Sequence, residues 1–176
     1  MISLYKKELS VFFSTIIGPL IIGLFLLING LVLWSEMSSF NILDNAYASM
    51  DAFFFISPIL FLIFIPAISM RIFSEEYSSG TIEILITKPI KSYYIVLVKF
   101  LSVLTIILLS IAPTLLYVLT ISYLGDQSLD IDFAGIFGSY IGLFMLSGIF
   151  ASIGVFSSAI TNNQITSFLL AIIIST

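Results

Sequence analysis

The segment Arg71–Lys91, RIFSEEYSSGTIEILITKPIK, interrupts an otherwise apolar chain and sets its topology. The 176-residue chain holds 6 basic and 10 acidic residues, and six of these charges fall within this one segment. Gly80 precedes a short apolar run in the segment, and Pro89 follows it. The segment is therefore expected to be a polar connection with defined structure, placed between two apolar regions.

The composition around this segment is that of a membrane protein. Hydrophobic residues make up 60% of the chain and charged residues 9%, whereas soluble domains carry about 25% charged residues. A soluble chain of this length could not remove so much apolar surface from water. We therefore expect an all-α polytopic membrane protein whose main solvent is lipid.

The residue types that support most enzyme chemistry are missing. The chain has no histidine and no cysteine, so it lacks the usual general base, the commonest metal ligand and any thiolate site. Glu75 and Glu76 are adjacent carboxylates, but neighbouring residues of a helix point about 100° apart. We expect no catalytic residue, no cofactor and no metal, which disfavours an enzyme that acts on lipids. The acidic pI near 4.5 predicts repulsion of nucleic acid.

Four apolar runs are long enough to cross a bilayer as helices, since a span needs roughly 20 residues. The first run is uncharged over 25 residues, which is longer than the apolar region of a signal peptide. The four expected spans are Val11–Ser35, Ala52–Met70, Tyr93–Leu124 and Phe133–Ile160.

Shorter helices are expected at both ends of the chain. Apolar residues share one helical face of Met1–Ser10 while Lys6 and Lys7 lie off it, which predicts an amphipathic helix anchored in the membrane interface. The last run, Ile165–Thr176, begins a fifth span after a TNNQ turn. At 1.5 Å per residue it covers about 18 Å, less than a hydrocarbon core about 30 Å thick. A longer protein, of which this is a fragment or truncation, is therefore expected.

The basic residues fall on one side of this predicted topology. They occur only at the N-terminus and around the connection between the second and third spans. The other two long loops contain six acidic residues and no basic one. Because lysine and arginine mark the cytoplasmic side, the N-terminus, Arg71–Lys91 and the TNNQ turn are all expected in the cytoplasm.

Within the charged segment, the sequence predicts a short amphipathic helix over Thr81–Thr87. Gly80 can serve as its N-cap, and Glu83 lies near the positive end of its dipole. Pro89 disfavours any continuation. A plain connector needs only a few residues, so this insert favours a docking element for a cytoplasmic partner. A solvated loop is the alternative.

Other positions in the spans are candidates for helix contacts. Asn29 can donate a hydrogen bond between helices, and packing is its expected role rather than translocation. Gly138 and Gly142 form a G-x-x-x-G pair, and the small residues Gly148, Ala151 and Gly154 follow in the same span. Small residues let helices approach closely, and packing inside the chain is favoured over a subunit interface. We expect no charged residue in the middle of a span, which argues against an ion-coupled transporter.

The stretch SEEYSSGTIEILITKPIK resembles the signature of ABC-2 class permeases of ABC transporters. In that family an acidic residue is followed by Gly-Thr-x-Glu-x-Leu and then by a proline. The matching positions here are Glu76, Gly80, Thr81, Glu83, Leu85 and Pro89. The resemblance implies a cytoplasmic coupling helix that meets a separate ATPase subunit, which would dock on Glu75–Pro89. The sequence agrees, since it contains no G-x-x-x-x-G-K-[ST] phosphate loop.

The likeness extends over nearly the whole chain. The stretches YKKELSVFF, FNILDNAYASMDAFFF, FIPAISMRIFSEE and NNQITSFLLA are similar to the gliding-motility-associated permease subunit of Bacteroidetes. Such permeases have six spans, so the resemblance implies one transmembrane domain over residues 1–176 without the rest of the fifth span and the sixth. It also implies export, the inner membrane, and a second permease copy or related membrane subunit. The alternative is a non-transporting scaffold or anchor of the gliding machinery.

Overall fold

The computed structural model describes residues 2–34, 50–87, 91–124 and 132–176, with the backbone alone at 84–86 and 124. All regular structure in these residues is helical. Four helices are long and apolar enough to cross a membrane and a shorter apolar helix follows them, which confirms the predicted fold class. The helices are α1 (Ile2–Ser14), α2 (Ile17–Trp34), α3 (Asp51–Ser69), α4 (Arg71–Ser78), α5 (Thr81–Ile86), α6 (Ser92–Ile111), the 3₁₀ turn η1 (Ala112–Thr114), α7 (Leu115–Leu124), α8 (Phe133–Ile160) and α9 (Gln164–Ser175).

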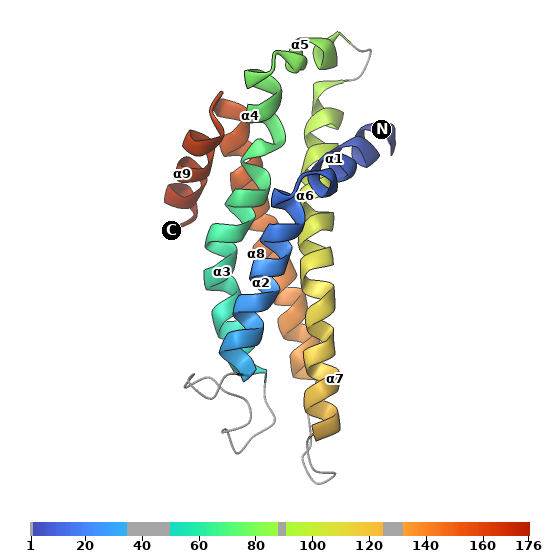
Figure 1. The fold of residues 1–176 in the computed structure, drawn as a ribbon, viewed down its shortest axis with the longest axis vertical. Helices are drawn as coiled ribbons and strands as arrows, with labels where there is room; N and C mark the ends of the chain where they lie inside the picture. The colour runs from blue at the N-terminus through green and yellow to red at the C-terminus, as the bar shows by residue number, and fades with distance from the viewer. Residues whose placement is uncertain (1, 35–49, 88–90, 125–131) are drawn as a thin grey trace.

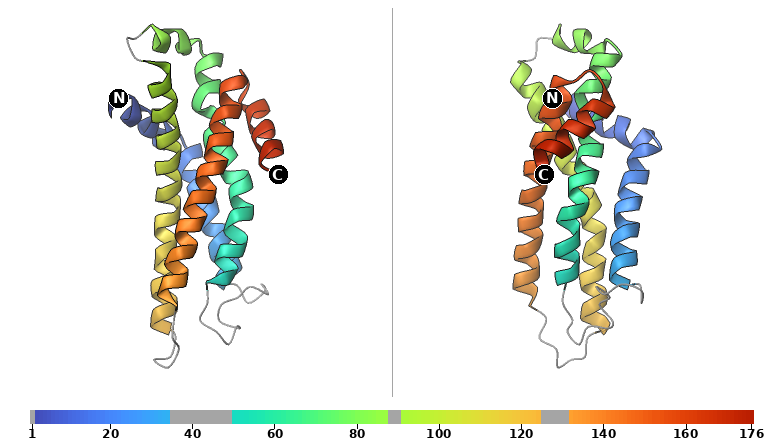
Figure 2. Two further views of the ribbon diagram at one scale, coloured as in Figure 1. Left: turned by 180° about the vertical axis from the view of Figure 1, so that it is seen from behind. Right: turned by 90° about the vertical axis from the view of Figure 1, so that its left-hand side faces the viewer.

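The spans form an elongated bundle with the charged segment at one end. Figure 1 shows α2, α3, α8 and the continuous rod of α6 and α7 running along the long axis. The short helix α5 lies at the end of the bundle where α4 stops and α6 starts. In Figure 2, α1 and α9 lie toward that same end, outside the four long helices.

The first span begins later than predicted. Helix α1 continues to Ser14, and the chain bends before α2 starts at Ile17. Gly18 permits the bend, because a Cβ at this position would overlap the carbonyl oxygen of Phe12. The predicted span Val11–Ser35 is therefore divided between the end of the N-terminal helix and α2.

The second span continues into α4 through a junction at Met70. Ser158 of α8 stabilises this junction: its hydroxyl accepts from the amides of Phe73 and Ser74 at 2.9 and 3.1 Å. The same hydroxyl donates to the Met70 carbonyl oxygen at 2.9 Å. These bonds satisfy amides at the start of α4 that have no partner within their own helix.

Close packing between α3 and α8 depends on a different glycine from the predicted pair. A Cβ at Gly154 would overlap the side chain of Ser69, so the glycine allows the two helices to approach. At Gly138 and Gly142 a Cβ would meet nothing within 4 Å. The expected packing of these two glycines inside the chain is therefore not met among the described residues, because their side of α8 faces outward.

The remaining spans keep their predicted extent closely. The third begins at Ser92 and passes through a 3₁₀ turn that contains Pro113, without losing its helical course. The fourth matches the predicted bounds. Asn163 then caps α9 by accepting a hydrogen bond from the amide of Ile165 at 2.9 Å, and α9 packs back on α8 and α3.

Candidate functional site

The segment predicted to dock an ATPase, Glu75–Pro89, is called the docking segment below; it starts in α4 and continues through a tight turn into α5. Gly80 forms this turn with a φ of 69°, in the left-handed region that glycine adopts at little cost. It follows the last turn of α4, and its own amide donates to the carbonyl oxygen of Tyr77 at 3.2 Å. The predicted helix after Gly80 is present and ends at Ile86, one residue earlier than expected.

Most of the residues predicted for docking that the structure describes face outward. Thr81 and Glu83 are exposed on α5, and the Thr81 hydroxyl lies 2.9 Å from that of Ser79. Glu75 binds Arg71 within α4, with Nε to Oε2 at 2.9 Å and Nη2 to Oε1 at 3.1 Å. Of the other two predicted positions, Leu85 lies in α5 and Pro89 lies outside the described residues.

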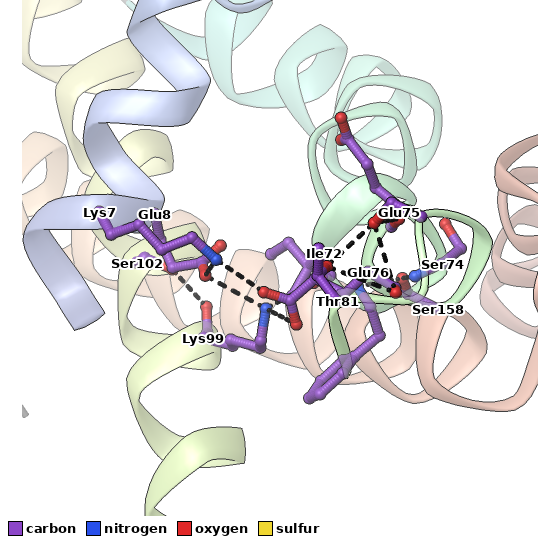
Figure 3. A network of polar contacts seen from close by, with 12 residues as sticks. Lys7, Glu8, Ile72, Ser74, Glu75, Glu76, Thr81, Lys99, Ser102 and Ser158 are labelled. Carbon is purple, nitrogen blue, oxygen red and sulfur yellow. Dashed lines mark hydrogen bonds and ion pairs between the residues drawn. The ribbon is translucent and has the colours of Figure 1, made fainter. Parts of the chain in front are cut away.

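Glu76 differs from the rest because its side chain points into the bundle. It is 8% exposed, and its carboxylate binds two lysines from other helices (Figure 3). Oε1 accepts from Lys7 Nζ of α1 at 2.8 Å, and Oε2 lies 2.9 Å from Lys99 Nζ of α6. Together with Glu8 of α1, these residues form what we call the charge cluster: Lys7, Glu8, Glu76 and Lys99.

Lys99 is the centre of this cluster and is fully buried, with 0% of its surface exposed. Its ammonium donates to the carbonyl oxygen of Ile72 at 2.6 Å and to Glu8 Oε1 at 3.2 Å. The 2.9 Å contact with Glu76 is an ion pair rather than a well-directed hydrogen bond. The ammonium also lies 4.8 Å from the ring centroid of Phe73, within cation–π range. A buried charge needs such compensation to be tolerated.

The cluster is electrically balanced, with two ammonium and two carboxylate groups. Lys7 is its exposed edge, since 51% of that side chain is accessible. Partial burial alone would lower the pKa of the Lys7 ammonium, but its hydrogen bond to Glu76 and the charges of Glu8 and Glu76 raise the pKa overall. Lys7 is therefore protonated at neutral pH, and its ion pair with Glu76 is fully formed there.

The predicted anchor lysines have different surroundings. Lys6 is exposed on α1 and stays a predicted interfacial anchor, whereas Lys7 is directed to Glu76. In the sequence, Lys99 is one of the basic residues around the connection between the second and third spans, and it served only as a marker of the cytoplasmic side. One signal could have found it: Lys99 is the eighth residue of α6, too deep for an unpaired ammonium, so a carboxylate partner was required.

A second set of polar contacts lies in the half of the bundle farther from α5. Asn29 of α2 is 1% exposed and accepts a hydrogen bond from Ser57 of α3 at 3.3 Å. Its amide nitrogen donates to the Phe25 carbonyl oxygen within α2. The predicted interhelical hydrogen bond is present, but Asn29 is its acceptor and not its donor.

The four long apolar helices define a multi-pass membrane protein, with the short helix α5 on a charged connection between two of them. The sequence profile of a family described as ABC-2 family transporter protein matches residues 7–176. The chain therefore belongs to the ABC-2 family and is a membrane permease component of that transporter type. The family lacks a nucleotide-binding domain and implies an ATPase partner. No curated protein and no solved structure shows significant similarity to the chain.

Proposed function

We propose that a separate ATPase subunit docks on Glu75–Pro89 and drives this permease as an exporter. The observation that carries the proposal is the position of α5, a six-residue helix at the tip of the bundle with Thr81 and Glu83 exposed. A short apolar run with a charged rim suits a small docking interface. The ATPase would supply the energy, and the permease would convert its motion into movement of helices.

The proposed orientation places this tip in the cytoplasm and the protein in the inner membrane. Lys7 in α1, Arg71 at the start of α4 and Lys91 before α6 all belong to the end of the bundle that carries α5 (Figure 1). Asp51 and Asp132 precede or begin helices at the opposite end. This distribution supports a cytoplasmic N-terminus by the positive-inside rule.

The proposal extends to two further partners of the permease. A second permease copy or a related membrane subunit would complete the transport path, and the outward-facing Gly138 and Gly142 offer a flat surface for it. The similarity of four sequence stretches to a gliding-motility permease supports a role in gliding. Loss of gliding in cells whose partner ATPase cannot hydrolyse ATP is expected, whereas a scaffold role predicts that gliding survives.

Docking is tested by co-purification of the tagged chain with its candidate ATPase, a co-expressed neighbouring gene product that carries a phosphate loop. Gly80→Pro should abolish recovery of the ATPase, because proline cannot adopt a φ of 69°. Glu83→Lys should lower the recovery about tenfold, since a reversed charge at an interface costs on the order of 1.4 kcal/mol or more. The matched control is Asp51→Lys, the same reversal at the other end of the bundle, which should leave recovery unchanged. Unchanged recovery with both docking variants would overturn the proposal.

A further inference from the structure

Helix α4 is attached to the bundle in two different ways. At its start, the hydroxyl of Ser158 holds the Met70 junction against α8. Beyond the junction, α4 packs mainly on α8, and its backbone makes few close approaches to α6. The link between α4 and α6 is made by the Lys99 ammonium of α6, which pairs with the Glu76 carboxylate at 2.9 Å and donates to the Ile72 carbonyl oxygen of α4 at 2.6 Å.

On the other side of this link, α1 and α6 form one unit. Glu8 of α1 accepts a hydrogen bond from Lys99 of α6 at 3.2 Å. The hydroxyl groups of Tyr5 and Thr105 lie 2.7 Å apart and connect the same two helices a turn or more away. Glu76 thus joins the docking segment to α1 and α6, which are also linked directly by side-chain hydrogen bonds.

Whether movement of α4 is passed on to α6 depends on the chemistry of the contact between Glu76 and Lys99. Lipid tails are as apolar as the side chains of the spans, so polar contacts between helices add to van der Waals packing in holding the helices together. Separation of Glu76 from Lys99 would leave a fully buried ammonium short of a counter-charge, which is strongly unfavourable. A displacement of α4 is therefore followed by α6, and by α1 through Lys7 and Glu8.

We propose that Glu76 and Lys99 are positioning residues that transmit displacement of the docking segment to the N-terminal helix α1 and to the third span, α6. The inference rests on the proposed function, because the displacing force comes from the docked ATPase. Ser158 holds the near end of α4 against α8 and acts as its pivot, and the charge cluster is the point at which the movement passes to α1 and α6.

The variant that separates this role from a merely structural one is Glu76→Gln/Lys99→Met. It removes both charges of the central pair, keeps side chains of similar volume and leaves Lys7 and Glu8 to pair with each other at 3.6 Å. Replacement of a buried ion pair by neutral residues of similar volume is often neutral or stabilising. The double variant is therefore expected to fold. It is also expected to bind the ATPase, because the Glu76 carboxylate is buried against Lys7 and Lys99 and is not part of the outward-facing surface of the segment.

The experiment measures nucleotide-dependent movement of α1 relative to α8 in the reconstituted complex with the ATPase. The chain contains no cysteine, so spin labels can be placed at Ser10→Cys on α1 and Ile160→Cys on α8, both exposed. A non-hydrolysable ATP analogue should shift the population of label distances in the otherwise unaltered chain. In the double variant we expect this shift to fall about fivefold or more, the usual lower limit of coupling between sites, while ATP hydrolysis by the bound subunit continues.

The matched control is Lys91→Met, the same loss of a lysine from the exposed start of α6, which should keep the full shift. An undiminished shift in the double variant with the ATPase bound would overturn the proposal. Loss of ATPase binding in the double variant would also overturn it, because Glu76 or Lys99 would then act in docking itself. Failure of the unaltered chain to bind the ATPase would instead refute the docking proposal, and this inference with it.

Discussion

The two ends of the bundle are held together by different chemistry. At the end that carries α5, charged groups from α1, α4 and α6 meet at 2.8, 2.9 and 3.2 Å. At the opposite end, neutral groups join neighbouring helices. These contacts are Ser57 to Asn29 at 3.3 Å, Thr114 to Tyr140 at 3.1 Å and Tyr117 to the Leu26 carbonyl oxygen at 3.3 Å.

The difference concerns strength and reach. Hydrogen bonds between hydroxyl groups are usually near 2.7–2.8 Å, so the neutral contacts at 3.1 and 3.3 Å are long, and each joins only two helices. Charge-assisted bonds are about twice as strong, and the charge cluster joins three helices at one point. At the end that carries α5, three helices are therefore held together at one point. At the opposite end each contact joins two helices, so one contact can change without the others.

Glu76→Leu is the substitution expected to have the largest effect, because it removes the central carboxylate of the charge cluster. It leaves the buried ammonium of Lys99 with Glu8 as its only ion-pair partner among the described residues, and loss of one partner from a buried pair costs about 3–5 kcal/mol. The free energy of unfolding in detergent, followed by circular dichroism, should fall by an amount at the low end of this range.

The neighbouring residue supplies the control for that measurement. Glu75→Leu removes the same charge one position earlier, from a pair that stays within α4 and is 40% exposed on the carboxylate side. An exposed pair of this kind contributes about 0.3–0.5 kcal/mol. Equal losses for the two variants would mean that the charge cluster adds nothing to the stability of this end.

The second largest effect is expected within α8, whose two halves differ in packing. Gly154→Ala places a methyl group against the side chain of Ser69 and should lower the free energy of unfolding by about 1–3 kcal/mol through overpacking. Gly142→Ala is the control, because its methyl group meets nothing within 4 Å. That variant should be neutral or slightly stabilising, since alanine favours helix more than glycine. If Gly142→Ala lowered the free energy of unfolding more than Gly154→Ala did, the half of α8 that contains Gly142 would be the closely packed one.

The sequence predicted the helices better than it predicted their contacts. Hydropathy and length placed the second, third and fourth spans, because a bilayer imposes about 20 apolar residues on any helix that crosses it. The first span was misplaced, since apolar residues fill both the end of α1 and the start of α2. The bend between them coincides with the Gly18–Pro19 pair, a local signal of a helix break that hydropathy and length alone do not use.

The candidate site was predicted in part for the same physical reason. The family motif, with Gly80 before the apolar run and Pro89 after it, predicted a short helix after α4. This prediction was possible because these signals are local in the sequence. The charge cluster joins residues 69 and 91 positions apart, and only the packing of α1 against α6 brings them together. The motif glutamate Glu76 was therefore assigned to an outer docking surface although its carboxylate faces the core.

The smallest effect is expected for the neutral contact between Asn29 and Ser57, and a double-mutant cycle measures it. Asn29→Leu, Ser57→Ala and the combined variant should give a coupling free energy of about 0.6 kcal/mol, the average for hydrogen bonds between membrane helices. The value is small because each group finds other partners when the helices separate, as the bond from Asn29 to the Phe25 carbonyl oxygen illustrates. A coupling above about 2 kcal/mol would exceed the largest value usual for such bonds. The contacts at the two ends of the bundle would then be of similar strength, and the proposed difference between the charge cluster and the neutral contacts would be wrong.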